Sequence, residues 1–160
     1  MAIDVRPVKQ ECVRQAMAIR AKNGVGVQRS EGRYRDVALF AIEQPEVGAE
    51  GVAAVGRTCF VRRGPQGIVG ASLHGGNRLS ADGQVVLASQ LAGDLVASFG
   101  PTAIDVISQQ YDSHWIEVFS PQPPAKVIVD GKPQPAVYDA ARRLVRIEGY
   151  CPRRVQIMLP

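Results

Sequence analysis

The feature that most constrains this chain is the regular spacing of its turn signals. From residue 24 onward, short apolar runs alternate with glycine, proline, asparagine and aspartate, and a turn recurs roughly every 8–12 residues. Short runs of this kind suit β-strands with one buried face, because successive side chains of a strand point to opposite sides. We therefore predict a mainly-β fold, an antiparallel β-sandwich of jelly-roll-like type.

The stretch His114–Ile147 is the clearest example of this rhythm. In its opening run, HWIEVF, the side chains of Ile116 and Val118 face one way and those of Trp115, Glu117 and Phe119 face the other. A proline-rich break follows at 121–124, then the runs KVIV and LVRI, separated by an Asp-Gly turn and a second turn after Tyr138. This order predicts an antiparallel meander.

The same signals place the remaining strands. We expect strands at Val25–Arg29, Tyr34–Ile42, Val52–Arg63, Ile68–Leu73, 84–88, 95–99, 103–108 and 155–159. We expect a loop at Gln44–Gly51 and turns at 30–32, 64–67, Asp82-Gly83, Gly93-Asp94 and Gly100-Pro101. In the last strand, Val155, Ile157 and Leu159 share one face.

The N-terminal segment allows two interpretations. Pro7–Lys22 contains good helix formers with an apolar face, and Asn23-Gly24 would cap such a helix. Asn-Gly is also a strong two-residue hairpin signal, so Ala18–Lys22 could instead pair with Val25–Arg29. We favour the helix. The predicted organisation is an N-terminal appendage over residues 1–24, helix or hairpin, followed by one sandwich domain over residues 25–160.

Composition excludes several classes of protein. With 160 residues, 46% hydrophobic and 21% charged, the chain is neither disordered nor a membrane protein, and it is long enough for one core. No signal peptide is recognisable, which indicates the cytoplasm, or an extracytoplasmic place if the chain is a piece of a secreted enzyme. The net charge of +4 is modest. We expect solvated arginines at strand ends rather than a nucleic-acid surface, the pairs being Arg62-Arg63, Arg142-Arg143 and Arg153-Arg154.

The three cysteines are far apart and give no metal-ligand spacing. Cys59 lies in an alternating run and is expected to be a small buried residue. A disulfide between Cys12 and Cys151 is compatible with the sequence but not specified by it. No phosphate-binding loop, dinucleotide fingerprint or calcium loop is present, so we expect no cofactor and no metal.

Two segments contain candidate site residues. The cluster Tyr111–Trp115 holds an aspartate, His114 and two aromatic residues, and Arg78 is a residue that could join it in space. Tyr111 and Trp115 could stack on a sugar, and His114 could transfer protons. The alternative is that Trp115 simply packs. The second segment, which begins at His74, is His-Gly-Gly-Asn; it resembles an oxyanion-hole segment but is more typical of a glycine turn between two strands. We predict Tyr111, His114, Trp115, Arg78 and His74 as ligand-binding residues.

Two motifs carry a resemblance to a known family. The segment GIVGASLHGGNRLSADGQVVLAS resembles the recurring hairpin in the C-terminal β-sandwich domains of heparinase II/III-like polysaccharide lyases. The segment KVIVDGKPQPAVYDAARRLVRI is similar to the closing hairpin of many carbohydrate-active enzymes. The resemblance covers about Val52–Glu148. It implies an accessory or C-terminal module, since the catalytic apparatus of such lyases resembles one built by a preceding helical toroid, and no catalytic residue is carried over.

Three functions follow as hypotheses. The leading one is a non-catalytic accessory module of a carbohydrate-active enzyme, whose partners are that parent enzyme and an anionic polysaccharide. The second is a small hydrolase or lyase that uses His114 with Tyr111 or His74. The third is a structural or assembly subunit, and an edge strand or apolar sheet face would make it a homo-oligomer.

Overall fold

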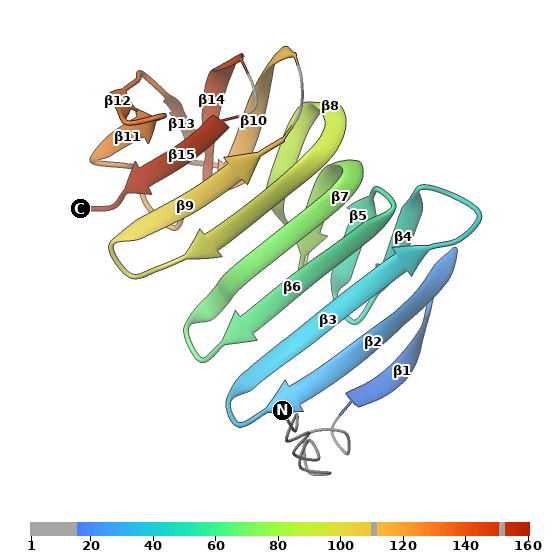
Figure 1. Ribbon diagram of the computed structural model, residues 1–160. Helices are drawn as coiled ribbons and strands as arrows, with labels where there is room; N and C mark the ends of the chain where they lie inside the picture. The colour runs from blue at the N-terminus through green and yellow to red at the C-terminus, as the bar shows by residue number, and fades with distance from the viewer. Residues whose placement is uncertain (1–15, 110–111, 151–152) are drawn as a thin grey trace, which may run out of the picture.

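The protein is built from antiparallel β-strands. The computed structural model describes residues 16–109, 112–150 and 153–160, which contain no helix. The strands, labelled in Figure 1, are β1 (Ala16–Ala21), β2 (Gly24–Glu31), β3 (Tyr34–Ala41), β4 (Glu46–Ala49), β5 (Val52–Val55), β6 (Thr58–Gly64), β7 (Gly67–Ala81), β8 (Gln84–Phe99), β9 (Ala103–Ser108), β10 (Ser113–Phe119), β11 (Lys126–Val129), β12 (Lys132–Pro133), β13 (Val137–Asp139), β14 (Leu144–Tyr150) and β15 (Arg153–Met158).

These strands form one open antiparallel sheet that folds over into two layers (Figure 1). The first layer has the order β1-β2-β3-β6-β7-β8-β9-β15-β11-β12. The second layer contains β4, β5, β10, β14 and β13, and is joined to the first through β7 and β8. The prediction of a mainly-β, antiparallel, sandwich-like fold is confirmed.

The long strands β7 and β8 belong to both layers. Residues 67–74 of β7 pair with β6, whereas residues 78–81 pair with β5. The β7–β8 register shifts between Leu73 and Gly76 and again before Arg78, so the strand is bulged where it changes layer. Gly75 sits there with a φ of +58°, a backbone conformation that favours glycine. The His74-Gly75-Gly76 segment is therefore a bulge inside a strand, and the predicted turn between two strands is wrong.

The core lies between the layers. In most strands alternate residues point inward, and the largest fully buried side chains are leucines and isoleucines from both layers, among them Leu39, Leu73, Leu79, Leu87 and Ile116. Val155 and Ile157 share the buried face of β15, whereas Leu159 lies just after the end of that strand, and Cys59 is buried as predicted. One expectation fails: Arg153 is only 3% exposed and donates a hydrogen bond from Nη2 to the carbonyl oxygen of His114 at 3.0 Å, so it is not a solvated strand-end arginine.

Several predicted turns are confirmed. The β2–β3, β6–β7, β7–β8 and β8–β9 connections fall where glycine, proline and aspartate predicted them. Asp82 and Gly83, and likewise Asp130 and Gly131, all have positive φ, the conformation that two-residue hairpin turns require. Gly93-Asp94 is an exception, because both residues lie within β8 and form no turn.

The favoured N-terminal helix is wrong over its described part. Ala16–Ala21 is strand β1, and it pairs with β2 from Ala16↔Arg29 to Ala21↔Gly24. Asn23 has a φ of +57°, so the hairpin alternative holds. The rest of Pro7–Lys22 before residue 16, and Cys12, lie outside the described residues. The division of the chain at residue 24 stays a prediction.

Two further strand predictions need correction. The expected loop Gln44–Gly51 contains β4, which pairs with β5. The expected single strand Val52–Arg63 is two strands, because the chain leaves the second layer after β5 and enters the first layer as β6. Gly56 and Arg57 make this crossing.

The meander prediction over His114–Ile147 is wrong in its pairing. The strands exist, but β10 pairs with β14 and β8, whereas β11 pairs with β15 and β12. The proline-rich segment after β10 carries the chain from one layer to the other. Two hairpins form as expected: β11 pairs with β12 across Asp130-Gly131, and β13 pairs with β14. None of the described residues forms a helix of the length and apolar character that crossing a membrane requires.

Candidate functional site

A groove of about 310 Å³ lies on the outer surface of the second layer, beside Trp115. We call it the Trp115 groove. Its lining residues come from β7, β8 and β10 and from the turn before β14. They are Asn77, Arg78, Val85, Ala88, Ser89, Gln90, Trp115, Glu117 and Arg142.

The strand register explains why these residues meet. On β10, Ile116 and Val118 are fully buried, so Trp115 and Glu117 point outward, as the sequence predicted. Arg78 of β7 lies opposite Ala88 of β8, and Ala88 lies opposite Glu117. The small Ala88 side chain between two long ones leaves a hollow on the face of the sheet.

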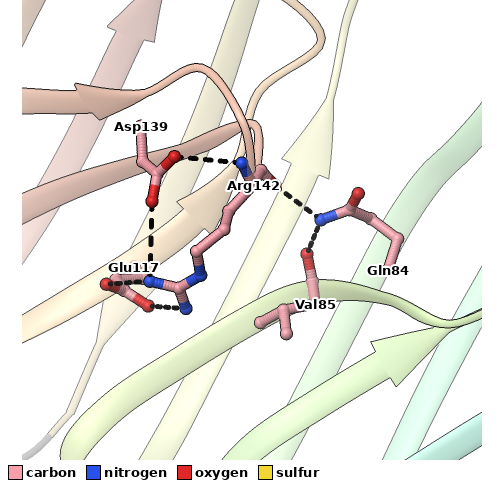
Figure 2. A network of polar contacts seen from close by, with 5 residues as sticks. All are labelled: Gln84, Val85, Glu117, Asp139 and Arg142. Carbon is pink, nitrogen blue, oxygen red and sulfur yellow. Dashed lines mark hydrogen bonds and ion pairs between the residues drawn. The ribbon is translucent and has the colours of Figure 1, made fainter.

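A charged pair forms one wall of the groove (Figure 2). Arg142 donates two hydrogen bonds to the Glu117 carboxylate, from Nη1 to Oε1 at 3.2 Å and from Nη2 to Oε2 at 2.8 Å. The Glu117 side chain is only 8% exposed and that of Arg142 is 51% exposed. These hydrogen bonds raise the pKa of Arg142 above its ordinary value. The pair is bidentate, and its two charges cancel.

The backbone of the turn holds Arg142 in place. Its N–H donates to Asp139 Oδ1 at 3.0 Å, and its carbonyl oxygen accepts a hydrogen bond from Gln84 Nε2 at 2.8 Å (Figure 2). Gln84 also donates to the carbonyl oxygen of Val85, at 3.0 Å. The turn between β13 and β14 is thereby attached to the start of β8. We expect little movement of the Arg142 guanidinium when a ligand binds.

Trp115 has a cation on one side. The guanidinium carbon of Arg146 lies 4.6 Å from the centroid of the indole, and Arg146 also approaches Glu148, with 3.5 Å between Nε and Oε1. Arg146 belongs to β14 and does not line the groove. The indole therefore separates Arg146 from the groove, and its surface toward β8 is the part that the groove presents to a ligand.

Arg78 supplies the charge that the groove does not neutralise. The residue is exposed, and the structure gives its guanidinium no hydrogen bond or ion pair with any described residue. The other charges of the lining are the paired Glu117 and Arg142. Arg78 can therefore receive an anion without first giving up a protein partner.

The structure brings together only part of the predicted set. Trp115 and Arg78 share the groove. His114 is 3% exposed, on the opposite side of β10 from Trp115, with Nδ1 2.8 Å from the carbonyl oxygen of Asp112. His74 pairs with β6 in the first layer and lies 3.5 Å from Asp94, between Nδ1 and Oδ2. Tyr111 lies outside the described residues. The two histidines are thus on different layers, and neither lines the groove.

The glycine segment after His74 does not form an oxyanion hole with a nucleophile. The N–H of Gly75 donates to the Asp94 carboxylate, with N and Oδ1 2.9 Å apart. A backbone donor that already holds a carboxylate is not free to stabilise a developing negative charge. This part of the hydrolase hypothesis has no support in the described geometry.

The sequence prediction did not assign five polar residues of the groove to the site: Asn77, Ser89, Gln90, Glu117 and Arg142. For Glu117 a signal was present, since it shares the outward face with Trp115 in HWIEVF. For Arg142 the sequence held no signal, because its position depends on the β10–β14 pairing. In the described ranges, no group of three or more histidine, cysteine or acidic side chains could hold a metal ion.

Comparison with known proteins adds no identification. The sequence matches no model of a known protein family, and a search of curated proteins finds no significant relative.

Proposed function

We propose that this chain is a non-catalytic β-sandwich accessory module of a carbohydrate-active enzyme, and that it binds an anionic glycan in the Trp115 groove. The observation that carries the proposal is the placement of the Trp115 indole and the unneutralised Arg78 guanidinium around one hollow above Ala88. An aromatic ring beside a guanidinium without a protein partner is complementary to a sugar ring that bears a carboxylate or a sulfate.

Each part of the groove has a distinct task in this proposal. The indole packs on the C–H face of a sugar ring, and Arg78 donates paired hydrogen bonds to the acidic group. The neutral polar residues Asn77 and Gln90 are suited to hydroxyl groups. The Glu117–Arg142 pair keeps one wall rigid without adding net charge.

We expect the wild-type chain to be retarded in affinity gels that contain a polyuronate or a sulfated glycan, and to migrate normally with a neutral glucan. Trp115→Ala should weaken binding about tenfold, because stacking on an aromatic ring contributes roughly 1–1.5 kcal/mol. Arg78→Gln should weaken binding to the acidic polymer by a similar factor. Isothermal titration calorimetry with an oligosaccharide of the retained polymer measures both changes.

The matched control is Arg33→Gln, which removes the same charge from the exposed β2–β3 turn. If Arg33→Gln and Arg78→Gln weaken binding equally, the attraction is non-specific and the groove is not the site. An absence of retention with every acidic and neutral polymer rules out glycan binding.

A second candidate function, that of an assembly subunit, is favoured by a different observation. A cross-strand row on the outer face of the first layer is largely apolar and partly exposed. It consists of Val27, Ala38, Phe60, Ser72, Val96 and Ile107, which are successive partners across six strands. Val27, Val96 and Ile107 are 42%, 39% and 37% exposed. A largely apolar row of this length is suited to packing against another protein surface.

We expect the isolated chain to self-associate through this row at high concentration, and Val96→Lys to weaken the association about tenfold, because a charge would be buried in the contact. Sedimentation velocity over a concentration series measures the change. Val137→Lys is the control, since Val137 is 69% exposed and lies in the second layer. A chain that stays monomeric throughout the series contradicts the assembly function and leaves the glycan proposal in place.

A further inference from the structure

A second hollow lies at one end of the sandwich and is lined by residues of both layers. We call it the end cavity. Its volume is about 710 Å³, and it is bordered by the β6–β7 turn, the β8–β9 turn and the segment after β10. It shares no lining residue with the Trp115 groove. Its size falls within the range of roughly 300–1,000 Å³ that is typical of small-molecule sites.

The walls of the end cavity are mainly apolar. Ile68, Phe99, Ile104, Phe119 and Leu159 line it, and each of them also belongs to or packs against the core. The rings of Phe99 and Phe119 are tilted by 52°, with centroids 6.3 Å apart. Phe99 comes from the first layer and Phe119 from the second, so the contact between their rings joins the two layers at this end of the sandwich. An apolar group placed against both rings would extend the core and leave water.

One cation stands at the rim. The guanidinium carbon of Arg143 lies 5.2 Å from the centroid of the Phe119 ring, and Nη2 donates to Gln84 Oε1 at 3.4 Å. The partner in that hydrogen bond is a neutral amide. Asp82 also lines the cavity, but its carboxylate accepts two hydrogen bonds from Arg63, at 3.0 and 3.1 Å. The charge of Arg143 is therefore the one that a ligand could neutralise.

We propose that the end cavity binds an amphipathic organic anion. The apolar chain or ring of the ligand lies between the layers against Phe99 and Phe119, and its carboxylate receives hydrogen bonds from Arg143. The charge on the rim and the apolar walls behind it match the two ends of such a molecule. A fully apolar ligand would leave Arg143 without an anion, and a polar one would place its polar groups against the apolar walls.

The test uses decanoate below its micelle concentration and decanol as its neutral analogue, with calorimetric or fluorescence titration of the full chain. We expect saturable binding of decanoate and at least about tenfold weaker binding of decanol, because hydrogen bonds to a charged group are the stronger kind. Arg143→Gln should remove the preference for decanoate. Ile68→Trp should weaken both ligands by filling part of the cavity.

Two controls distinguish this site from others. Arg33→Gln removes an exposed arginine elsewhere and should bind decanoate as the wild type does. Trp115→Ala alters the groove alone and should also leave decanoate binding unchanged. The proposal is overturned if decanoate does not saturate the wild-type chain by about 1 mM, a weak limit for a specific site. It is also overturned if decanol binds equally well, or if neither Arg143→Gln nor Ile68→Trp changes the affinity while circular dichroism shows both variants folded.

Discussion

Replacing Gly76 by alanine is expected to destabilise the fold by about 3 kcal/mol, the upper part of the range for an added core methyl group. A Cβ at this position would lie 2.3 Å from the carbonyl oxygen of Val55 and 2.5 Å from the Cα of Gly56. Both are backbone atoms and cannot rotate away. Urea denaturation followed by circular dichroism measures the loss of unfolding free energy.

The clash is severe because two layer crossings lie against each other. β7 passes from the first layer to the second at Gly75 and Gly76, and the chain between β5 and β6 passes the other way at Gly56 and Arg57. The second crossing is fixed by hydrogen bonds: Gly56 N–H donates to the Pro45 oxygen at 2.7 Å, and Arg57 N–H donates to the His74 oxygen at 3.0 Å. Neither segment can therefore shift to make room.

Gly70→Ala is the matched control, since Gly70 lies on the same strand. A Cβ there would meet its nearest atoms, on Ala97 and Arg62, at 3.9 Å, which is ordinary contact. We expect a change within about 0.5 kcal/mol, or a slight gain because alanine restricts the unfolded chain. A Gly76→Ala variant as stable as Gly70→Ala would show that the two crossings do not pack together as described.

The glycines in hairpin turns and the glycines at the layer crossing differ in how well the sequence predicted their roles. Asp82-Gly83 and Asp130-Gly131 were recognised as turns, because the preference for positive φ is a property of the residues themselves. Gly75 and Gly76 were expected to be a turn for the same reason. Their role as a bulge depends on Gly56, which is about twenty positions earlier, and no local pattern contains that contact.

Strand existence was easier to predict than strand pairing. The alternation in HWIEVF and KVIV correctly predicts β10 and β11. The two strands do not pair, because β11 joins β15 in the first layer and β10 joins β14 in the second. Alternation is set by burial of one face and says nothing about which edge receives the strand. The same limit applies to β1, where helix-forming residues are overruled by pairing with β2.

Only part of the candidate site could be predicted from the sequence, because alternation gives the direction of a side chain but not the pairing of its strand. The outward direction of Trp115 and Glu117 follows from the sequence, because it depends only on the two-residue period of β10. The approach of Arg142 depends on the turn between β13 and β14, and that of Arg78 on the β7–β8 register. His114 was grouped with Trp115 through adjacency in sequence, yet adjacency in a strand places two side chains on opposite faces.

Raising the pH from 8 to 10.5 is expected to cost the wild-type chain about 2 kcal/mol more stability than it costs Cys59→Ala. Cys59 is 3% exposed in the core, and burial raises the pKa of its thiol from 9.0 to about 11. Below about pH 8 the thiol keeps its proton in both states, so stability is unaffected. Between pH 9 and 11 the unfolded chain releases the proton while the folded chain retains it, so unfolding becomes more favourable as the pH rises.

Comparing the wild type with Cys59→Ala isolates the titration of Cys59. All remaining ionisable groups, Cys12 and Cys151 included, are present in both chains, so their contributions to the pH dependence are the same. The quantity to measure is the difference between the two unfolding free energies, from urea denaturation at each pH in the presence of a reductant. That difference should be constant up to about pH 8.5 and then move against the wild type. Site-resolved alkylation gives a second measurement: at pH 8.5 Cys59 should react with iodoacetamide at least about 50 times more slowly in the folded chain than in urea, because its thiolate is scarce and buried. Parallel stability curves, together with fast alkylation of Cys59 in the folded chain, would contradict its place in the core between β3 and β7.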